Sequence, residues 1–336
     1  MKKKILIAFS IILALILILI GIVYFYIHNK VSQIEYVEVD KGAIEINEGV
    51  EESLEEYRNI ALLGIDNTDE DYGEGNRSDC IIIASINKKT NEVNLISVYR
   101  DTYFEIVGRD LDKVNHAYSF GGPELAMSTL NTNMDLDITE FVVVNFDTVA
   151  DTVNALGGVE IEITKDEIQY INNYISSTSR RTGIKSSQIT KVGKQNLDGV
   201  QAVAYSRIRY TEGQDYKRTE RMRTVLTAMF EKAKGKGIGE INTILTNILP
   251  KMRTNISTWE IISLLPQMTS FKVNESIGWP YDTKGYDVYG PYYGAPVTLE
   301  SNTIRLHKEM LGQENYTPTQ RVIDISEKIA NKTGYR

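Results

Sequence analysis

The hydrophobic pattern of the chain begins with one long uninterrupted run. Residues 5–27 contain no charged side chain, and as a helix they would span about 34 Å, against a hydrocarbon core of roughly 30 Å. A cleaved signal peptide would have a shorter apolar region that ends in small residues. This run instead ends in Tyr24, Phe25 and Tyr26. The pattern therefore predicts an uncleaved transmembrane signal anchor at 5–27.

The charges around this run predict its orientation. Lysines occupy residues 2–4, Lys30 follows the run, and no acidic residue occurs before Glu35. Because positive charge favours the cytoplasmic side, we expect residues 1–4 to be a cytoplasmic stub and the rest of the chain to lie outside the cell membrane. Residues 31–57 hold nine acids and one lysine. They predict an acidic extracellular stalk at 28–57, or alternatively a weak helix or strand pair at the domain edge.

Beyond residue 58, short apolar runs alternate with segments of helical character. We expect strands at 60–65, 80–86, 93–99, 141–146, 159–163 and 271–277, the second and third forming a hairpin. We expect helices at 123–134, 147–156, 197–205, 217–234, 239–253 and 257–268, with Asp147 as one N-cap. This order predicts a single α/β (α+β) domain at 58–314, with a central mixed β-sheet flanked by helices. For residues 315–336 we expect a C-terminal helix or tail.

Composition narrows the possible functions. A chain of 336 residues that is 42% hydrophobic and 24% charged can bury a core, which excludes a wholly disordered protein. The net charge is -8, and without the four N-terminal lysines it is 33 basic against 45 acidic residues, or -12. Such an acidic domain argues against a nonspecific nucleic-acid binder. One cysteine, Cys80, and three histidines without a close His or Cys pair disfavour disulfides and a zinc site.

Charged residues stand at the ends of the predicted strands. Asp66 closes the first strand and Asp79 opens the second. If these strands pair, the two carboxylates come together and, with water and phosphate oxygens, make a reasonable Mg²⁺ site. Each aspartate could instead be an ordinary cap or turn residue. Arg100 and Asp101 leave the second strand of the hairpin at a sheet end, where the alternative is a surface ion pair.

Further arginines follow in two closely spaced pairs. Arg207 and Arg209 would point about 200° apart on a helix, but on an extended strand at 205–210 they would share a face. Arg218 and Arg221 begin a predicted helix, where a spacing of three places them on one side and a bound anion is favoured. Because guanidinium groups bind phosphate oxygens bidentately, the arginines predict a site for a diphosphate.

From about Asn59 to Arg223, the chain resembles the LytR-CpsA-Psr family of cell-wall proteins. The similar segments are Gly64-Ile-Asp66, Arg77-Ser-Asp79, Ile96-Ser-Val-Tyr-Arg100-Asp101-Thr, Lys113-Val-Asn115-His-Ala-Tyr118, Phe141-Val-Val-Val-Asn-Phe, Asn154-Ala-Leu-Gly-Gly-Val-Glu, Ala204-Tyr-Ser-Arg207-Ile-Arg209 and Asp215-Tyr-Lys-Arg218-Thr-Glu-Arg221. The chain departs from the family at Tyr99, where proline is usual, at Cys80, where threonine is usual, and at Met222, where glutamine is frequent.

The resemblance implies a membrane-anchored extracellular enzyme of Gram-positive bacteria. Such enzymes transfer polyprenyl-diphosphate-linked glycopolymers, of the teichoic acid or capsule type, onto peptidoglycan. It further implies that Asp66 and Asp79 bind Mg²⁺ (or Mn²⁺) and that an apolar pocket holds the polyprenyl chain. The residues expected at the diphosphate, including Arg221 from its helical spacing, are Arg77, Arg100, Arg207, Arg209, Arg218 and Arg221.

The expected reaction is phosphoryl transfer, in which positioning and charge neutralisation provide most of the catalysis. We expect catalytic roles for Arg100, Asp101, Arg207, Arg209 and Asp215. Asp101 and Asp215 are the candidate bases, and the sequence does not choose between them. A pyrophosphatase using the same site, and a non-enzymatic extracellular regulator that binds lipid diphosphate, are the alternatives.

One aromatic segment stands outside these motifs. Residues 278–293 contain Trp279 and several tyrosines, Tyr292 and Tyr293 among them. The segment could form a glycan-contacting loop, but the same residues could simply pack within the fold.

Overall fold

The central element of the fold is a seven-stranded mixed sheet. The computed structural model describes residues 18, 21–67, 72–73, 75–209, 214–287 and 292–336, without the side chains of residues 214–215 and 238–241. Within them the strand order is β1-β10-β7-β2-β3-β4-β11. The bounds are β1 (Glu35–Tyr36), β2 (Tyr57–Ile65), β3 (Ser78–Asn87), β4 (Glu92–Val98), β7 (Glu140–Asn145), β10 (Arg253–Thr254) and β11 (Lys272–Trp279).

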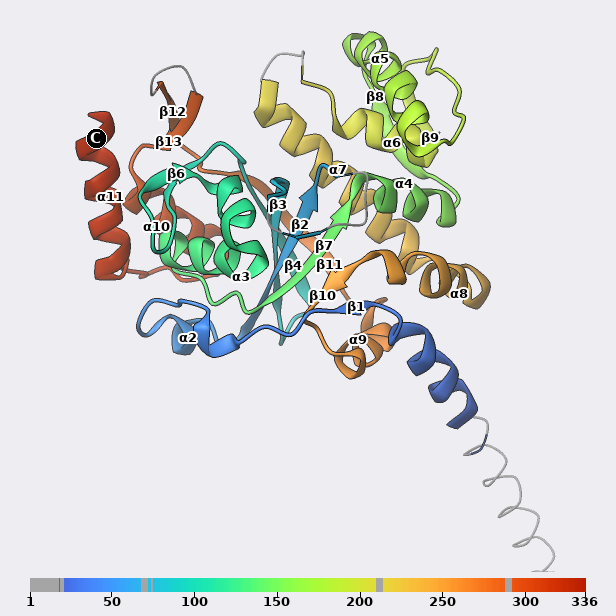
Figure 1. Cartoon of the computed structure of the whole chain (residues 1–336), viewed down its shortest axis with the longest axis horizontal. Coiled ribbons are helices and arrows are strands. Elements are labelled where there is room, and N and C mark those ends of the chain that lie inside the picture. Colours follow the sequence, from blue (N-terminus) through green and yellow to red (C-terminus); the bar gives the residue numbers. More distant parts are fainter. Residues whose placement is uncertain (1–17, 19–20, 68–71, 74, 210–213, 288–291) are drawn as a thin grey trace, which may run out of the picture.

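The middle strands are buried on both faces, as their nearly continuous apolar runs predict. Leu63 and Ile83 belong to the core formed with α3 (Val114–Met134), α10 (Leu299–Met310) and α11 (Gln320–Thr333). Leu62 and Ile82 face the other way and pack with α7 (Gln214–Lys234). Figure 1 shows these helices on the two sides of the sheet, and the expected sheet flanked by helices is confirmed.

A smaller apolar cluster lies beyond the carboxyl ends of β2 and β7 (Figure 1). It is built from α4 (Phe146–Ala155), α5 (Lys165–Thr182), α6 (Gly199–Ser206) and the antiparallel hairpin of β8 (Val159–Ile163) and β9 (Gly193–Leu197). Helix α5 begins with a capping box between Thr164 and Glu167, and Gly183 ends it in the left-handed region. This cluster covers the edge of the sheet at which the charged ends of the strands lie.

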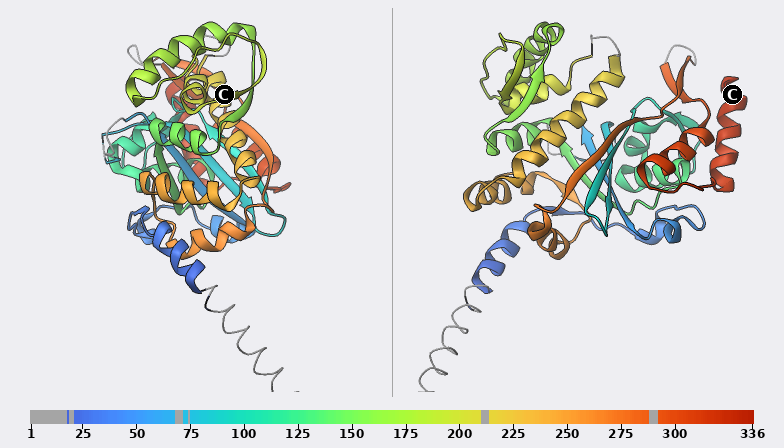
Figure 2. Two further views of the ribbon diagram at one scale, coloured as in Figure 1. Left: turned by 90° about the vertical axis from the view of Figure 1, so that its right-hand side faces the viewer. Right: turned by 180° about the vertical axis from the view of Figure 1, so that it is seen from behind.

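The N-terminal segment leaves the domain at the opposite end. Residues 21–31 are helical, and both views in Figure 2 show this helix projecting from the end of the molecule away from α5. The expected cytoplasmic stub at 1–4, and residues 5–17 and 19–20 of the expected signal anchor, lie outside the described residues. In the part of the chain that the structure describes, no helix has the length and apolar character that crossing a membrane requires.

The acidic segment at 28–57 is part of the folded domain, so the expected stalk is corrected. Val31 and Leu54 are fully buried, and Ile44 and Val50 are nearly so. Strand β1 pairs in parallel with β10 at the edge of the central sheet, which agrees with the alternative of a strand at the domain edge. The buried residues of this segment are irregularly spaced, so no periodicity reveals them.

The C-terminal residues are also integral to the domain. A helix is present as expected, but α11 buries Val322, Ile325 and Ile329 almost completely against the main core. Ahead of it, Thr319 donates hydrogen bonds of 2.8 Å from both its backbone nitrogen and its hydroxyl to the buried carboxylate of Asp135. Because these contacts are extensive, residues 315–336 are not a peripheral tail.

Several helix boundaries differ from the expected ones for local reasons. Of the stretch at 205–210 that was expected to be extended, residues 205–207 are not, because α6 continues through Ser206 and Arg207 retains right-handed helical dihedral angles. Tyr210 lies outside the described residues. Asn145, and not Asp147, caps α4, since its side chain accepts from the backbone of Thr148. The remaining elements are α2 (Val50–Ser53), α8 (Ile238–Asn247), α9 (Thr258–Leu264), β5 (Tyr103–Glu105), β6 (Leu111–Lys113), β12 (Thr283–Asp287), β13 (Tyr292–Pro296), and the 3₁₀ turns η1 (Lys41–Ala43), η2 (Leu249–Lys251) and η3 (Leu265–Gln267).

Candidate active site

Three strands bring their charged ends to one edge of the sheet. Strand β3 is antiparallel to both β2 and β4, so the start of β3 lies beside the ends of its two neighbours. Asp66 follows β2, Asp79 lies near the start of β3, and Arg100 follows β4. The expectation that these side chains meet at a sheet edge is confirmed.

Asp66 and Asp79 line the same small hollow of about 210 Å³. We call it the arginine hollow, because three arginines complete its wall. The other lining residues are Phe146, Tyr174, Arg207, Arg209 and Arg218. Arg207 and Arg209 thus share one site although the chain there is not extended, since the helix ends between them and the intervening Ile208 is fully buried.

The carboxylate of Asp79 is the point at which the arginines converge. Its Oδ2 accepts from Arg100 Nη1 at 3.0 Å and from Arg218 Nη2 at 3.1 Å, and it lies 3.7 Å from Arg209 Nη2. Burial by itself would raise the pKa of Asp79, but Arg218, Arg100 and Arg209 outweigh it and hold the pKa below its usual value. The negative charge of the Asp79 carboxylate thus offsets positive charge of these arginines in the structure.

Arg207 lies on the opposite wall, over the rings of Phe146 and Tyr174 at 5.6 and 5.4 Å. Its Nη1 donates to the Thr178 hydroxyl at 3.3 Å. Burial lowers the pKa of Arg207 from its usual value, Asp66 opposes that shift, and Arg181 adds to it. Since a guanidinium group starts from a very high pKa it stays charged, and a half-buried cation of this kind favours a bound anion.

Arg181, at the end of α5, is a member of the site that the sequence interpretation missed. Its Nη1 donates to Asp66 at 2.7 Å, its Nε lies 3.5 Å from Asp147, and its guanidinium group is 5.3 Å from the centre of the Phe146 ring. In the sequence, Arg180 and Arg181 look like the ordinary positive charges of a helix C-terminus. Only the packing of α5 above the sheet shows that one of them bonds to Asp66 beside the arginine hollow.

Two of the expected site residues are placed elsewhere, and a third is described only by its backbone. Arg77 is exposed and does not line the arginine hollow. Arg221 is buried apart from the others, donating from Nε to Glu167 at 2.8 Å and from Nη1 to the carbonyl oxygen of Ile208 at 3.2 Å. Because Arg221 points to Glu167 and Ile208, its helical spacing from Arg218 is no longer a reason to assign it to the diphosphate. Asp215 lies in the first turn of α7, and its side chain is outside the described part of the structure.

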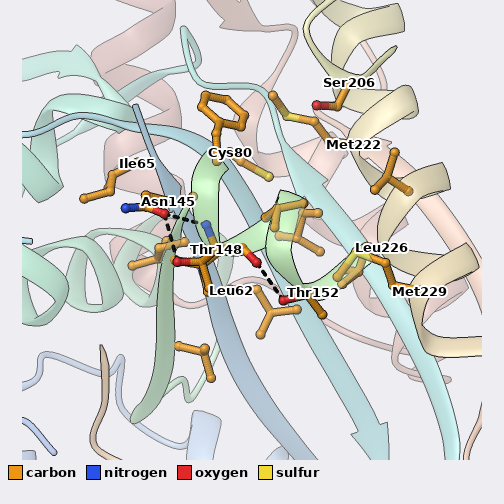
Figure 3. Close-up of a pocket in the computed structure, with 18 of the residues that line it drawn as sticks. Leu62, Ile65, Cys80, Asn145, Thr148, Thr152, Ser206, Met222, Leu226 and Met229 are labelled. Carbon is orange, nitrogen blue, oxygen red and sulfur yellow. Dashed lines mark hydrogen bonds between the residues drawn. The ribbon is translucent and has the colours of Figure 1, made fainter. Parts of the chain in front are cut away.

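An apolar pocket of about 210 Å³ lies between the sheet and helices α4, α6 and α7 (Figure 3). It follows α7 for two turns, from Met222 to Met229, which corresponds to about 10 Å. The hydroxyl groups in its wall are bonded within the protein: Thr148 donates to Asn145 at 2.8 Å and Thr152 to the Thr148 carbonyl oxygen at 2.7 Å. The surface left to a ligand is therefore apolar.

The apolar pocket and the arginine hollow adjoin each other. Phe146 lines both. Ile65 and Cys80 line the pocket, whereas the adjacent Asp66 and Asp79 line the hollow. Burial raises the pKa of the Cys80 thiol to about 12, so this side chain is neutral and acts as part of the apolar wall. Together the two spaces suit a molecule with an apolar tail and a compact anionic head.

A second polar hollow, of about 410 Å³, touches the arginine hollow at Asp79 and Arg218. We call it the tyrosine hollow. Asp101 stands in its wall, held by Lys113 Nζ at 2.7 Å and close to Arg100 Nε at 3.4 Å. The lining residues are Asp79, Tyr99, Arg100, Asp101, Thr102, Lys113, Tyr216, Arg218, Thr219, Thr283, Tyr292 and Gly294.

Some residues of the aromatic segment at 278–293 pack within the fold, and another lies at the surface. Trp279 is fully buried and donates to the Asn302 carbonyl oxygen at 3.2 Å. Tyr293 packs on Tyr103, with ring centroids 4.9 Å apart. Tyr292 is 45% exposed and lines the tyrosine hollow. Packing within the fold accounts for the first two residues, and Tyr292 alone of these faces a ligand-sized space.

Asp66 and Asp79 offer two carboxylates to a metal ion. Among the described residues there is no group of three or more His, Cys, Asp or Glu side chains that could hold one. Mg²⁺ characteristically takes one or two protein carboxylates and completes its octahedron with water and substrate phosphate oxygens. The donor set therefore fits Mg²⁺ that binds together with a diphosphate, and does not fit an all-protein metal site.

Known proteins share this sequence and fold. The LytR_cpsA_psr family model matches residues 22–294. The chain is 34% identical over 267 residues to the polyisoprenyl-teichoic acid–peptidoglycan teichoic acid transferase TagU of Enterococcus faecalis, covering 76% of this chain and 80% of that protein. It is 32% identical over 233 residues to TagT of Bacillus subtilis, covering 67% of this chain and 69% of that protein.

Solved structures agree with these relatives. TagT bound to LIIa-WTA superposes with a TM-score of 0.58 and 26% identity, covering 89% of this chain and 94% of that chain. The LytR-CPS2A-psr family protein YwtF (TagT) with bound octaprenyl pyrophosphate lipid gives a TM-score of 0.54 and 25% identity over the same shares. The matched residues include every strand and helix that builds the arginine hollow. The chain therefore belongs to the LytR_cpsA_psr family.

Proposed function

We propose that this protein is a membrane-anchored extracellular phosphotransferase that attaches polyprenyl-diphosphate-linked anionic glycopolymers, of the teichoic acid or capsule type, to peptidoglycan. The observation that carries the proposal is the junction between the apolar pocket and the arginine hollow at Phe146. An apolar tail and a diphosphate joined to it would occupy these two spaces in that order. The names of the relatives TagU and TagT, and the lipid held by one TagT structure, support the same ligand class.

The reaction exchanges one phosphorus–oxygen bond for another. A hydroxyl group of a peptidoglycan sugar attacks the sugar-side phosphorus, and a new bond forms between its oxygen and that phosphorus. The bond from the same phosphorus to the bridging oxygen breaks, so polyprenyl phosphate leaves with the electron pair. The hydroxyl proton passes to a base. Arg207, Arg209 and Arg218 would hold the phosphate oxygens and neutralise the charge that develops, which is the main catalytic requirement of such reactions.

Asp101 is the base that the arrangement favours. It lines the tyrosine hollow beside the arginine hollow, and Lys113 and Arg100 fix its carboxylate in place. A base has to lie within hydrogen-bonding distance of the hydroxyl that it deprotonates. An acceptor that enters through the tyrosine hollow would satisfy this condition.

The proposal includes Mg²⁺ or Mn²⁺ held by Asp66 and Asp79 together with diphosphate oxygens. A bound divalent cation would supply further charge neutralisation at the transferred phosphoryl group. Asp79→Asn should weaken the binding of Mn²⁺ in the presence of polyprenyl diphosphate by at least about tenfold, measured by electron paramagnetic resonance. Asp324→Asn, at an exposed position on α11, serves as the control. Equal Mn²⁺ binding by both variants would contradict the assignment.

The function is tested by following the polymer. Full-length protein in detergent is incubated with Mg²⁺ and a polyprenyl-diphosphate-linked polymer carrying a label in the polymer, with and without peptidoglycan. We expect the label in insoluble peptidoglycan and one polyprenyl phosphate released for each polymer attached. Label confined to soluble fragments in the presence of peptidoglycan would indicate a pyrophosphatase instead. Tight lipid-diphosphate binding without turnover would indicate a regulator.

A further inference from the structure

The tyrosine hollow adjoins the proposed diphosphate site, and its position suggests a second ligand. Within the described residues, its lining shares Asp79 and Arg218 with the arginine hollow and shares no residue with the apolar pocket. The arginine hollow in turn shares Phe146 with the apolar pocket. The arginine hollow therefore adjoins each of the other two spaces at a different wall.

This order matters because of the stereochemistry of phosphoryl transfer. The attacking and leaving oxygens lie roughly in line on either side of the phosphorus. If the diphosphate occupies the arginine hollow and the tail occupies the apolar pocket, polyprenyl phosphate departs on the Phe146 side. The attacking hydroxyl then has to approach from another wall. Asp79 and Arg218 form a wall that the arginine hollow shares with the tyrosine hollow.

The side chains of the tyrosine hollow suit a sugar ring. Tyr99 and Tyr216 meet edge to face with ring centroids 4.5 Å apart, and the hydroxyl oxygens of Tyr216 and Tyr292 are 3.4 Å apart. Tyr216 is 38% exposed and Tyr292 is 45% exposed. Tyrosine offers an apolar ring face together with a polar tip, which matches the alternating C–H and hydroxyl surface of a pyranose.

The backbone of β11 leaves space for this aromatic group. A Cβ atom added to Gly278 would lie only 2.1 Å from the hydroxyl oxygen of Tyr99, so a residue with a side chain cannot occupy that position without displacing the tyrosine. In the same wall, the carboxylate of Asp101 can accept a hydrogen bond from a sugar hydroxyl, and Lys113 and Arg100 hold it in place. The hollow thus offers both aromatic and hydrogen-bonding groups to a sugar.

We propose that the tyrosine hollow binds a sugar of the acceptor glycan strand, with Tyr216 and Tyr292 against the ring and Asp101 accepting the proton of the attacking hydroxyl. The inference rests on the proposed function, because it takes the diphosphate of the donor to occupy the arginine hollow. It assigns donor and acceptor to separate walls of one site.

The test compares Tyr292→Ala with the wild-type protein, both full-length in detergent. The probes are uncrosslinked peptidoglycan glycan strands as acceptor, sugar-free polyprenyl diphosphate, and the lipid-linked polymer. We expect the KM for glycan strands, and their Kd measured by direct titration, to rise about tenfold. The Kd values of both lipids should stay within about twofold of wild type. Tyr292→Phe, which keeps the ring, should restore most of the acceptor affinity.

The matched control is Tyr36→Ala, which removes a tyrosine that is 57% exposed on the edge strand β1. It should leave all these constants unchanged. Weaker binding of the lipid-linked polymer, with normal binding of sugar-free polyprenyl diphosphate, would place the donor sugar in this hollow and overturn the proposal. Unchanged glycan affinity in Tyr292→Ala would overturn it as well. Direct titration keeps the test valid even where no transfer is detected, because a failure of transfer alone bears on the proposed function.

Discussion

At the scale of single residues, Asp79 organises the site. Three arginines from separate parts of the chain meet at its carboxylate. The convergence of Asp79 with Asp66 could be suggested from the sequence, because both residues flank apolar strands and would come together if those strands paired. The contact between Asp66 and Arg181 could not, since it depends on how α5 packs above the sheet edge and not on any local pattern.

The lowered pKa of Asp79 predicts a contribution to acid stability. The folded-state pKa lies below its usual value because the three arginines outweigh the effect of burial. The stabilisation is therefore fully present above about pH 4 and is lost as the pH falls through the folded-state pKa. Asp79→Asn should show a shallower loss of unfolding free energy between about pH 4 and pH 2 than wild type, measured by urea denaturation. A slope equal to that of wild type would contradict the proposed ion pairs.

Arg181 and Arg180 provide a comparison between neighbours on one helix. Arg181 bonds to Asp66 at the arginine hollow, whereas Arg180 is exposed. We predict that Arg181→Ala weakens the binding of polyprenyl diphosphate by about tenfold, because a charge-assisted contact is worth about 1.5–3 kcal/mol. Arg180→Ala should bind as wild type does. Equal affinities of the two variants in a calorimetric titration would exclude Arg181 from the site.

At the scale of elements, the central strands could be predicted from their apolar runs, whereas a largely polar helix was not predicted. The strands at 60–65, 80–86 and 93–99 are present as β2, β3 and β4 with small shifts of their ends. Helix α5 was not predicted because most of its residues are polar. Its signals were nevertheless in the sequence: a capping box at Thr164 and an apolar stripe through Ile171 and Ile175.

The C-terminal helix α11 illustrates how a polar segment can still be structural. Ile325 is 1% exposed and belongs to the main core. Ile325→Ala should therefore reduce the free energy of unfolding by about 2–5 kcal/mol, measured by chemical denaturation of the full-length protein. Glu327→Ala, two residues away and exposed, should change it by less than about 0.5 kcal/mol. A small effect at Ile325 would mean that α11 is a detachable tail.

At the scale of the whole molecule, the N-terminal helix and the site lie at opposite ends of the sheet. The helix at 21–31 projects from one end, and α5 covers the site at the other (Figure 2). Only residues 32–34 separate that helix from β1. With the proposed anchor in the membrane, the domain would begin directly at the membrane surface, because no stalk lifts it away.

The proposed topology predicts the result of proteolysis on cells. Protease added to intact cells should degrade the domain from about residue 31 onward, since the lysines at 2–4 favour a cytoplasmic N-terminus. An immunoblot for the C-terminal residues, with a cytoplasmic marker as control, gives the outcome. Protection in intact cells and degradation after lysis would place the domain on the cytoplasmic side.

The most direct test of the account is the turnover of arginine variants in the transfer assay. Arg207→Ala and Arg209→Ala remove guanidinium groups from the arginine hollow, and each should lower turnover at least about tenfold, at roughly 1.4 kcal/mol per factor of ten. Lysine at either position should restore activity only in part, because a point charge cannot reproduce a bidentate contact. Arg180→Ala is the control. If the Arg207 and Arg209 variants fold normally and transfer polymer as fast as the Arg180 variant, the arginine hollow does not hold the diphosphate.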